Sequence, residues 1–255
     1  MRSVYIHIPF CSSICSYCDF CKFLHDEIWA DEYLSHLEKE INKYYDNDEV
    51  RTIYIGGGTP SVLSMENLKK LFSIIKVFDA SKLEEFTFEM NVNDITEEKL
   101  SFLKENGVNR ISVGVESFNK INLKYLNRKH TKQEIINNIK LVKKYFENIN
   151  VDLMYALSIE KFSVLKSDVK EILKLGVPHI SAYSLILEPN TALFVNKVKP
   201  ISEDLDYKMY KYIEKKFTKK GYHHYEVSNY SIPGYESVHN LNYWDNNEYY
   251  GFGLG

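Results

Sequence analysis

The sequence has few cysteines and no long apolar run. Its 255 residues include four cysteines, six prolines and two tryptophans. Four cysteines are sparse for a disulfide framework, and residues 1–10 alternate like a strand instead of forming the apolar run of an export signal. No apolar run reaches membrane-spanning length. A net charge of −3 gives no general reason to expect nucleic-acid binding. Together these absences predict a cytoplasmic globular protein.

All four cysteines lie in one short stretch near the amino terminus. Cys11, Cys15 and Cys18 follow a C-x3-C-x2-C spacing, with Tyr17 directly before the third and Cys21 after it. Three thiolates this close need a tight loop, and they select zinc, copper(I) or an iron–sulfur cluster. A structural zinc site usually draws on two separated knuckles, and the sequence has no second one. A [4Fe–4S] cluster with three protein ligands and one open iron is therefore favoured over zinc, with Cys21 as a spare thiol or a fourth ligand.

The rest of the chain alternates between strand-like and helix-like stretches. The predicted strands are 4–8, 52–55, 86–90, 110–115, 150–155 and 179–185, and the predicted helices between them are 29–45, 65–77, 96–106, 132–146 and 164–175. Such a series predicts a parallel sheet with right-handed crossovers. Since six units are too few for a closed eight-unit barrel, we expect an α/β fold in the form of an open partial (β/α)6 TIM-like barrel.

The carboxyl-terminal part departs from this alternation. One further helix is predicted at 205–217, and the lysines that crowd it indicate a solvated face more than an anion-binding site. From Tyr222 onward the sequence becomes rich in Tyr, Asn, Gly and His. We therefore expect a core domain at 1–200 and a short α+β extension at 201–255.

Polar residues and glycines fall where the predicted strands end. In parallel βα folds these carboxyl ends bind ligands. The glycine turn at 56–59 follows the second strand and has no lysine after it, so it is not a P-loop. The other residues at or near strand ends are Glu89, Glu116, Asp152 and Ser184. Arg128 offers a guanidinium suited to a carboxylate. This convergence predicts a ligand site.

Four segments resemble radical S-adenosylmethionine (SAM) proteins similar to oxygen-independent coproporphyrinogen III dehydrogenase, namely 5–11, 56–61, 110–118 and 126–130. The resemblance implies that Cys11, Cys15 and Cys18 hold the cluster. It also implies that Tyr5, Gly57 and Glu89 contact the SAM bound to it. The residues that match positions around a second SAM in the dehydrogenase are Tyr17, Gly58, Thr59, Glu116, Arg128, Asp152 and Ser184. No catalytic side chain is singled out, because the radical chemistry is carried out by the cofactor.

Two features resemble the heme chaperone branch of this family. Phe20 stands where the dehydrogenases have another cysteine, and residues 239–244 read HNLNYW, an HNxxYW motif. The resemblance implies a protein that binds heme and delivers it to acceptor proteins, with His239 as a candidate heme contact. It also implies an electron donor such as flavodoxin or ferredoxin. The alternative is an oxidase that converts propionates of coproporphyrinogen III to vinyl groups through a 5′-deoxyadenosyl radical.

Three features depart from the family pattern. Ala156-Leu157-Ser158 stands in place of a usual Gly-Leu-Pro, which predicts a loop of different shape. Glu116 stands in place of a usual glutamine and adds a charge. Relatives continue into a small C-terminal domain beyond the point that corresponds to residue 255, so we expect that domain to be absent from this sequence.

Overall fold

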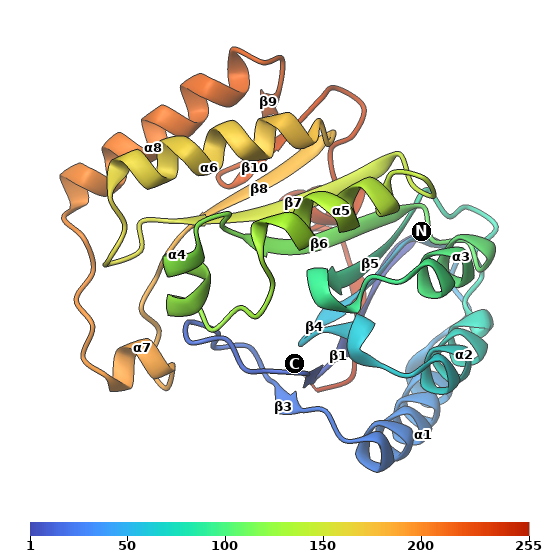
Figure 1. Cartoon of the computed structure of the whole chain (residues 1–255). Helices are drawn as coiled ribbons and strands as arrows, with labels where there is room; N and C mark the ends of the chain where they lie inside the picture. Colours follow the sequence, from blue (N-terminus) through green and yellow to red (C-terminus); the bar gives the residue numbers. More distant parts are fainter. Residues whose placement is uncertain (255) are drawn as a thin grey trace. The chain divides into compact units, whose positions relative to one another are not determined.

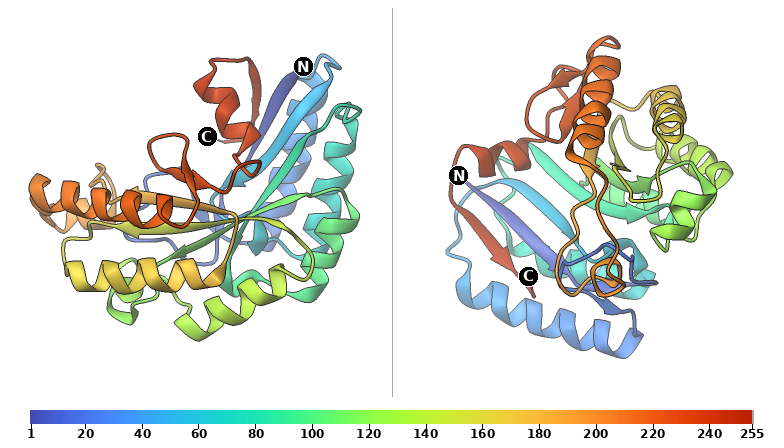
Figure 2. Two further views of the ribbon diagram at one scale, coloured as in Figure 1. Left: turned by 90° about the horizontal axis from the view of Figure 1, so that it is seen from above. Right: turned by 90° about the vertical axis from the view of Figure 1, so that its left-hand side faces the viewer.

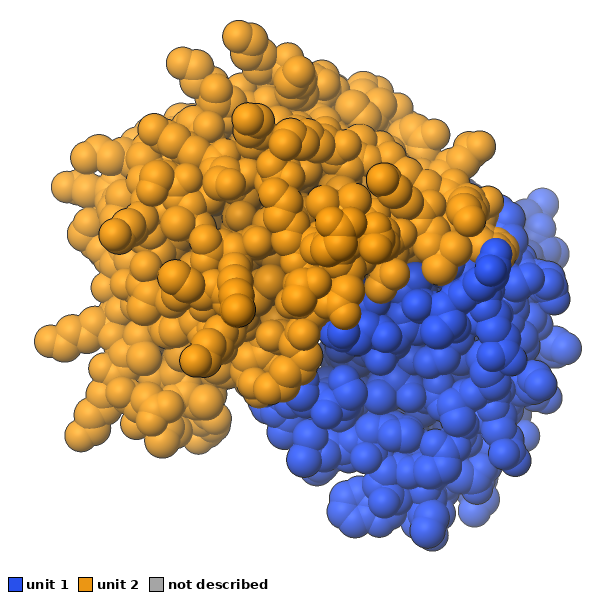
Figure 3. All heavy atoms as spheres, viewed as in Figure 1, with its two compact units in different colours: residues 1–14, 20–111, 237–255 blue, residues 15–19, 112–236 orange. Residues whose placement is uncertain are grey.

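The structure is a computed structural model that describes residues 1–254 (Figure 1). Its contacts group the chain into two compact units, coloured separately in Figure 3. Unit 1 comprises Met1–Ile14, Phe20–Ile111 and Ser237–Gly255, and unit 2 comprises Cys15–Asp19 and Ser112–Glu236. The cysteine loop is therefore divided, since Cys11 and Cys21 belong to unit 1 while Cys15 and Cys18 belong to unit 2. The predicted boundary near residue 200 stays a prediction.

Unit 1 has four parallel strands in the order β11-β1-β4-β5. They are β1 (Arg2–Ile8), β4 (Val50–Gly57), β5 (Glu85–Asn91) and β11 (Tyr249–Phe252). Its helices are α1 (Glu27–Tyr44), α2 (Met65–Ile74), α3 (Glu97–Glu105) and α9 (Val238–Trp244). Short elements complete it: β2 (Phe10–Cys11), β3 (Phe23–Leu24), η1 (Pro60–Val62), η2 (Ile75–Val77) and η3 (Val92–Asp94). Figure 2 shows β11 in red beside the dark blue β1, although they lie at opposite ends of the chain.

Unit 2 continues the alternation and then reverses direction. Its strands are β6 (Arg110–Glu116, with its first two residues in unit 1), β7 (Asn148–Tyr155), β8 (His179–Ser184), β9 (His223–His224) and β10 (Asn229–Ser231). Its helices are α4 (Lys120–Tyr125), α5 (Lys132–Val142), α6 (Phe162–Leu175), α7 (Ala192–Val195) and α8 (Glu203–Thr218). β7 and β8 are parallel, whereas β10 runs antiparallel to β8 and β9.

The predicted α/β fold with an open parallel sheet is confirmed. The strands follow the order β11-β1-β4-β5-β6-β7-β8-β10-β9, and within residues 1–254 no pairing joins its two ends. The tail adds more than predicted, because it supplies β11 at one edge and β10 with β9 at the other. None of the helices within residues 1–254 combines the length and the apolar character needed to cross a bilayer.

Local signals explain where several helices begin and end. The Asp26 side chain accepts hydrogen bonds from the backbone N–H groups of Ile28 and Trp29, which starts α1. Gly176, with φ 58°, ends α6 in the left-handed conformation that glycine favours. The predicted extent of the helix at 132–146 is wrong: α5 ends at Val142, and tighter turns follow as Tyr145 N donates to Val142 O.

Candidate functional site

The glycine turn after β4 is tied to the end of β5 within unit 1. Gly57 N donates to Glu89 Oε2 at 3.2 Å, and Tyr54 OH donates to Glu89 Oε1 at 2.6 Å. Gly57 has φ +111°, and a Cβ there would lie 2.7 Å from the His7 ring. A Cβ on Gly58 would lie 2.8 Å from backbone atoms of the neighbouring segment. Both positions therefore require glycine, and the structure brings the predicted Gly57 and Glu89 together.

Tyr5 extends this polar group along β1. Its hydroxyl lies 3.1 Å from His7 Nδ1, and its ring centroid lies 6.1 Å from that of Tyr54. Burial and the nearby Glu89 carboxylate raise the pKa of Tyr5 well above its ordinary value, so the phenol stays protonated and can donate a hydrogen bond. Sequence reasoning found Tyr5 and missed Tyr54 and His7. These two look like ordinary strand residues, and their spacing does not indicate a role in the site.

The same turn also holds the first cysteine. The single hydroxyl proton of Thr59 has two acceptors in reach, Gly58 O at 2.8 Å and Cys11 Sγ at 3.6 Å, and Thr59 N donates to Phe10 O at 2.7 Å. Cys11 is buried, with 7% of its surface exposed. Asn91 Nδ2 donates to Thr59 Oγ1 at 3.1 Å and orients that hydroxyl. Thr59 is thus positioned to tune the Cys11 sulfur, a role that the sequence did not predict.

In unit 2 the structure brings together Tyr17, Glu116 and Arg128. Tyr17 OH donates to Glu116 Oε1 at 3.0 Å, and Arg128 donates to Tyr17 OH at 3.0 Å and forms an ion pair with Glu116. The side chains of Arg128 and Glu116 are only 12% and 5% exposed. Burial opposes the charge of Arg128, but Tyr17 and Glu116 together raise its pKa well above the ordinary value. The charge added by Glu116 therefore neutralises Arg128 within the protein.

The two remaining predicted positions, Asp152 and Ser184, lie on neighbouring strands. Asp152 Oδ1 accepts from Asn150 Nδ2 at 2.8 Å in β7, while Ser184 Oγ donates to Asp206 Oδ2 of α8 at 2.9 Å. The register of β7 and β8 pairs Asp152 with Ser181 and Tyr155 with Ser184, so the two predicted residues are three positions apart. Asp206 was not predicted, because it lies in a helix outside the βα alternation.

The cysteine segment of unit 2 is held close to the same arginine. Cys18 N donates to Cys15 O at 3.4 Å, and Ser16 N donates to Leu126 O at 3.2 Å. Burial raises the pKa of the Cys15 thiol, and the nearby Arg128 opposes that shift. None of the four cysteines is joined to another in a disulfide. In the part of the chain that the structure describes, no three His, Cys, Asp or Glu side chains form a metal-binding group. The predicted three-thiolate ligand set, divided between the units, stays a prediction.

The loop after β7 keeps a conformation that glycine favours. Ala156, which stands where the family usually has glycine, has φ 63° and is 3% exposed. A left-handed conformation costs a residue with a Cβ about 1–2 kcal/mol, and such residues concentrate at functional sites. Although Ala156 replaces the usual glycine, the backbone at this position thus keeps a conformation that suits glycine.

We expect Ala156→Gly to stabilise unit 2 by about 0.5–1 kcal/mol, because relief of the left-handed strain exceeds the extra freedom of glycine in the unfolded chain. Urea unfolding measures this change. Ala182→Gly is the control, since this buried residue of β8 gains nothing from glycine, and it should lose about 1 kcal/mol. Equal losses in both variants would contradict the strain at Ala156.

Residues 5–176 match the radical SAM superfamily. The chain belongs to this superfamily. Its match covers the cysteine loop, the glycine turn, Glu89, Glu116, Arg128 and Asp152. Membership in the radical SAM superfamily implies a [4Fe–4S] cluster and SAM.

Radical SAM relatives confirm the predicted resemblance to the heme chaperone branch. The heme chaperone HemW of Lactococcus lactis is 47% identical over 261 residues, which cover 100% of this chain and 68% of that protein. HemW of Bacillus subtilis is 41% identical over 265 residues, covering 100% of this chain and 70% of that protein. The chain thus spans about two thirds of the length of these relatives.

A solved radical SAM structure shares the fold. Coproporphyrinogen III oxidase (HemN) from Escherichia coli superposes with a TM-score of 0.86 at 22% identity, over 99% of this chain and 63% of that one. This likeness shows the fold alone, and it agrees with the open parallel sheet.

The side chains present fit the cofactors of a radical SAM protein. The thiols needed for the cluster are not tied up in disulfides, and the Thr59 hydroxyl lies 3.6 Å from Cys11 Sγ. The close approach of backbone at Gly58 and the half-buried Glu89 carboxylate suit a cationic ligand that lies against the turn. The donor chemistry is thus consistent with an iron–sulfur cluster and the amino group of SAM.

His239, the candidate heme contact, lies in the interior of unit 1. It is 1% exposed, its Nδ1 lies 2.7 Å from Thr52 Oγ1, and its Nε2 lies 2.9 Å from Tyr243 OH. Burial, helped by the Arg110 charge, lowers the pKa of His239 to about 3, so the ring is neutral. Ligation of iron through Nε2 would require Tyr243 to move aside. The heme contact stays a prediction, and in this structure the imidazole joins α9 to β4.

Proposed function

We propose that this radical SAM protein binds heme and delivers it to acceptor proteins in the cytoplasm. The observation that carries the proposal is the 47% identity with the L. lactis heme chaperone over the whole chain. Phe20, which stands in place of the extra cysteine of the dehydrogenases, and the motif at 239–244 support the same branch. Delivery requires reversible binding, and it requires proteins that accept the heme. An electron donor such as flavodoxin or ferredoxin is the other proposed partner.

Within this proposal the predicted cluster ligands and SAM contacts have defined tasks. Cys11, Cys15 and Cys18 would hold the cluster, which together with SAM supplies reductive cleavage of the sulfonium. Tyr5, Gly57 and Glu89 would position the SAM amino group, since Glu89 is the carboxylate beside the turn. Within unit 2, Tyr17, Glu116 and Arg128 would offer a second ligand a paired, neutral surface, because Arg128 is already bonded to Glu116 and Tyr17.

Heme titration tests this function. Anaerobically reconstituted protein should show a saturable change of the Soret band on addition of heme. If His239 contacts heme, His239→Ala should weaken binding about tenfold, which is about 1.4 kcal/mol. Tyr243→Phe is the matched control, because it removes the partner of Nε2 and leaves the imidazole free to bind.

The outcomes separate the two parts of the proposal. Absence of any saturable Soret change in the wild-type protein would reject heme binding altogether. Equal heme affinity of wild type and a folded His239→Ala variant would reject the contact and leave heme binding intact.

The second candidate is an enzyme that decarboxylates coproporphyrinogen III. The fold shared with HemN, at a TM-score of 0.86, is the observation that favours it. Product analysis with SAM and a reductant discriminates, because formation of protoporphyrinogen would support the oxidase and replace the chaperone proposal.

A further inference from the structure

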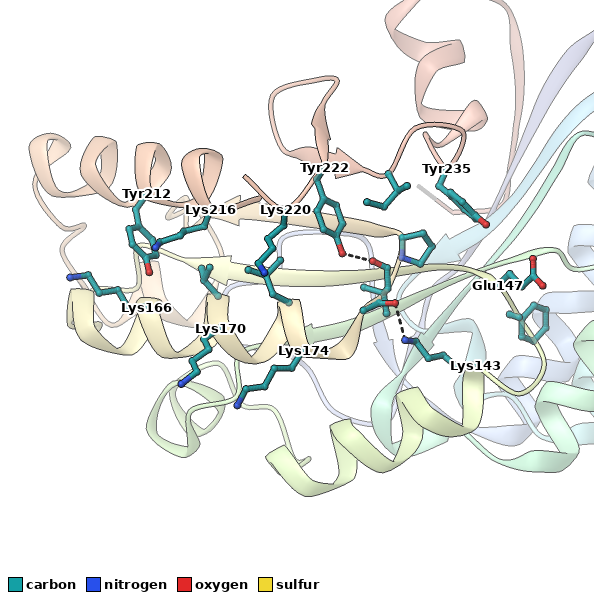
Figure 4. Close-up of a pocket in the computed structure, with 17 residues that line it drawn as sticks. Lys143, Glu147, Lys166, Lys170, Lys174, Tyr212, Lys216, Lys220, Tyr222 and Tyr235 are labelled. Carbon is teal, nitrogen blue, oxygen red and sulfur yellow. Dashed lines mark hydrogen bonds between the residues drawn. The ribbon is translucent and has the colours of Figure 1, made fainter. Parts of the chain in front are cut away.

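Unit 2 contains a groove of about 980 Å³ that lies outside the predicted site (Figure 4). Its walls come from α6, α8, the end of α5 and the segments that precede β7 and β8. Figures 1 and 2 show α6 and α8 running side by side within this unit. The groove is of the size that holds small organic ligands and cofactors.

The rim of the groove is basic. Six lysines contribute to it, and Glu147 is the one acidic residue among those lining it. The lysines are Lys143, Lys166, Lys170, Lys174, Lys216 and Lys220. Lys166 and Lys174 are eight residues apart on α6, or about 12 Å along the helix axis. Lys216 of α8 and Lys220 just after it, both expected from the sequence to lie on a solvated face, therefore share a concave surface with lysines of α6 and with one at the end of α5.

The floor of the groove is apolar and aromatic. It includes Val169, Leu173, Val177, Pro178 and Ile232, together with the rings of Tyr212, Tyr222 and Tyr235. In Figure 4 the Tyr212 ring and the Lys216 and Lys220 side chains extend from the α8 side toward α6. Tyr222 is fixed in place, because its hydroxyl donates to Val177 O at 2.5 Å. Such a floor offers flat surfaces on which a planar ligand can stack.

Several of the rim charges are not neutralised. Lys174 pairs with Glu171 at 2.7 Å, and Lys143 Nζ donates to Gly176 O at 2.8 Å. Across residues 1–254, by contrast, no ion pair involves Lys170, Lys216 or Lys220. Lys216 instead lies over the Tyr212 ring, 5.3 Å from its centroid. The groove thus combines an apolar floor with available positive charges.

We propose that this groove binds a porphyrin dicarboxylate, with heme as the ligand under the proposed function on which this inference rests. A porphyrin is a flat apolar ring with carboxylates on one edge, which matches an aromatic floor and a lysine rim. The seventeen lining residues include no His, Cys or Met, the side chains that most often ligate heme iron. Under the proposal, binding uses the ring and the carboxylates instead of a bond to iron, and the iron stays available to an acceptor protein.

The position of the groove keeps it apart from the strand ends where the cofactor residues of unit 2 lie. Pro178 and Glu147 come immediately before β8 and β7, at the amino ends of these strands. Glu116 and Ser184 end β6 and β8 at their carboxyl ends. A porphyrin in the groove does not compete for those positions.

Three probes test the ligand chemistry on the full chain: heme, iron-free protoporphyrin, and the dimethyl ester of that porphyrin. Absorbance and fluorescence titrations should give the iron-free dicarboxylate an affinity within about threefold of heme. The ester, which has lost both carboxylate charges, should bind about tenfold or more weakly. Equal binding of ester and dicarboxylate would overturn the proposal.

Two charge-reversal variants test the location. Lys216→Glu with Lys220→Glu should weaken heme and iron-free porphyrin about tenfold. Lys208→Glu with Lys215→Glu is the matched control, because it makes the same change of net charge in this region of the chain with lysines that do not line the groove. This control should change the affinity by less than about twofold.

These results distinguish failure of the groove proposal from failure of the proposed function. Saturable heme binding that both double variants weaken equally, or that neither weakens, would overturn the groove and leave heme binding standing. Absence of heme binding in the wild-type protein would reject the proposed function itself. A heme affinity that falls with His239→Ala and is unchanged by Lys216→Glu with Lys220→Glu would place the ligand in unit 1 and reject the groove.

Discussion

Replacement of Cys15 with serine is expected to abolish assembly of the [4Fe–4S] cluster, whereas Cys21→Ser should leave it intact. A cluster with one open iron needs all three thiolates, and serine supplies an oxygen that these soft irons bind poorly. Cys15 lies beside Arg128, whose charge favours the thiolate against the burial that raises its pKa. Cys21, in contrast, is exposed. We therefore expect it to be the spare thiol of the loop.

Iron and sulfide analysis after anaerobic reconstitution measures this result. Wild-type protein and Cys21→Ser should each bind about four irons per chain, and Cys15→Ser should bind close to none. Electron paramagnetic resonance with and without SAM then reports whether the open iron accepts the cofactor. A Cys21→Ser variant that loses the cluster would make Cys21 a fourth ligand. Stoichiometric zinc in place of iron would reject the cluster.

The second large effect is expected at Glu85, the buried carboxylate that anchors the tail. Its Oε1 accepts hydrogen bonds from Ser237 Oγ at 3.1 Å and His239 N at 3.2 Å, and its Oε2 accepts from Val238 N at 2.9 Å. Arg110 Nε lies 3.9 Å away, and both charged side chains are 2–3% exposed. Glu85→Ala leaves Arg110 buried without its counter-charge, so unit 1 should lose about 3–5 kcal/mol of stability.

Chemical denaturation measures this loss, and the neighbouring residue supplies the control. Glu84 also pairs with an arginine, Arg51, but its side chain is 48% exposed. Glu84→Ala should therefore cost less than about 1 kcal/mol. Glu85→Gln keeps a hydrogen-bond acceptor and loses the charge, so its loss of stability should lie between those of Glu84→Ala and Glu85→Ala. Similar losses for Glu84→Ala and Glu85→Ala would contradict the anchoring role of Glu85.

The sequence predicted the parts of the site that depend on local pattern. The cysteine spacing, the glycine turn and the alternation of strands and helices are all readable from neighbouring residues. Placement of Gly57 beside Glu89 followed from the same logic, because carboxyl ends of adjacent parallel strands meet at one edge of a sheet. The caps of α1 and α6 are local as well, although the helix predicted from residue 29 missed the Asp26 cap, whereas Gly176 follows directly on the predicted end of α6.

Other contacts were decided only by tertiary structure. His239 binds Thr52, 187 residues earlier in the chain, and no local pattern announces such a partner. The tail strands β10 and β11 are short and irregular in sequence, and they become strands because β8 and β1 offer free edges. Scattered lysines became the rim of one groove only when α6 and α8 packed side by side. Local sequence specifies conformation and residue chemistry, whereas the partners of a buried side chain depend on how distant segments pack.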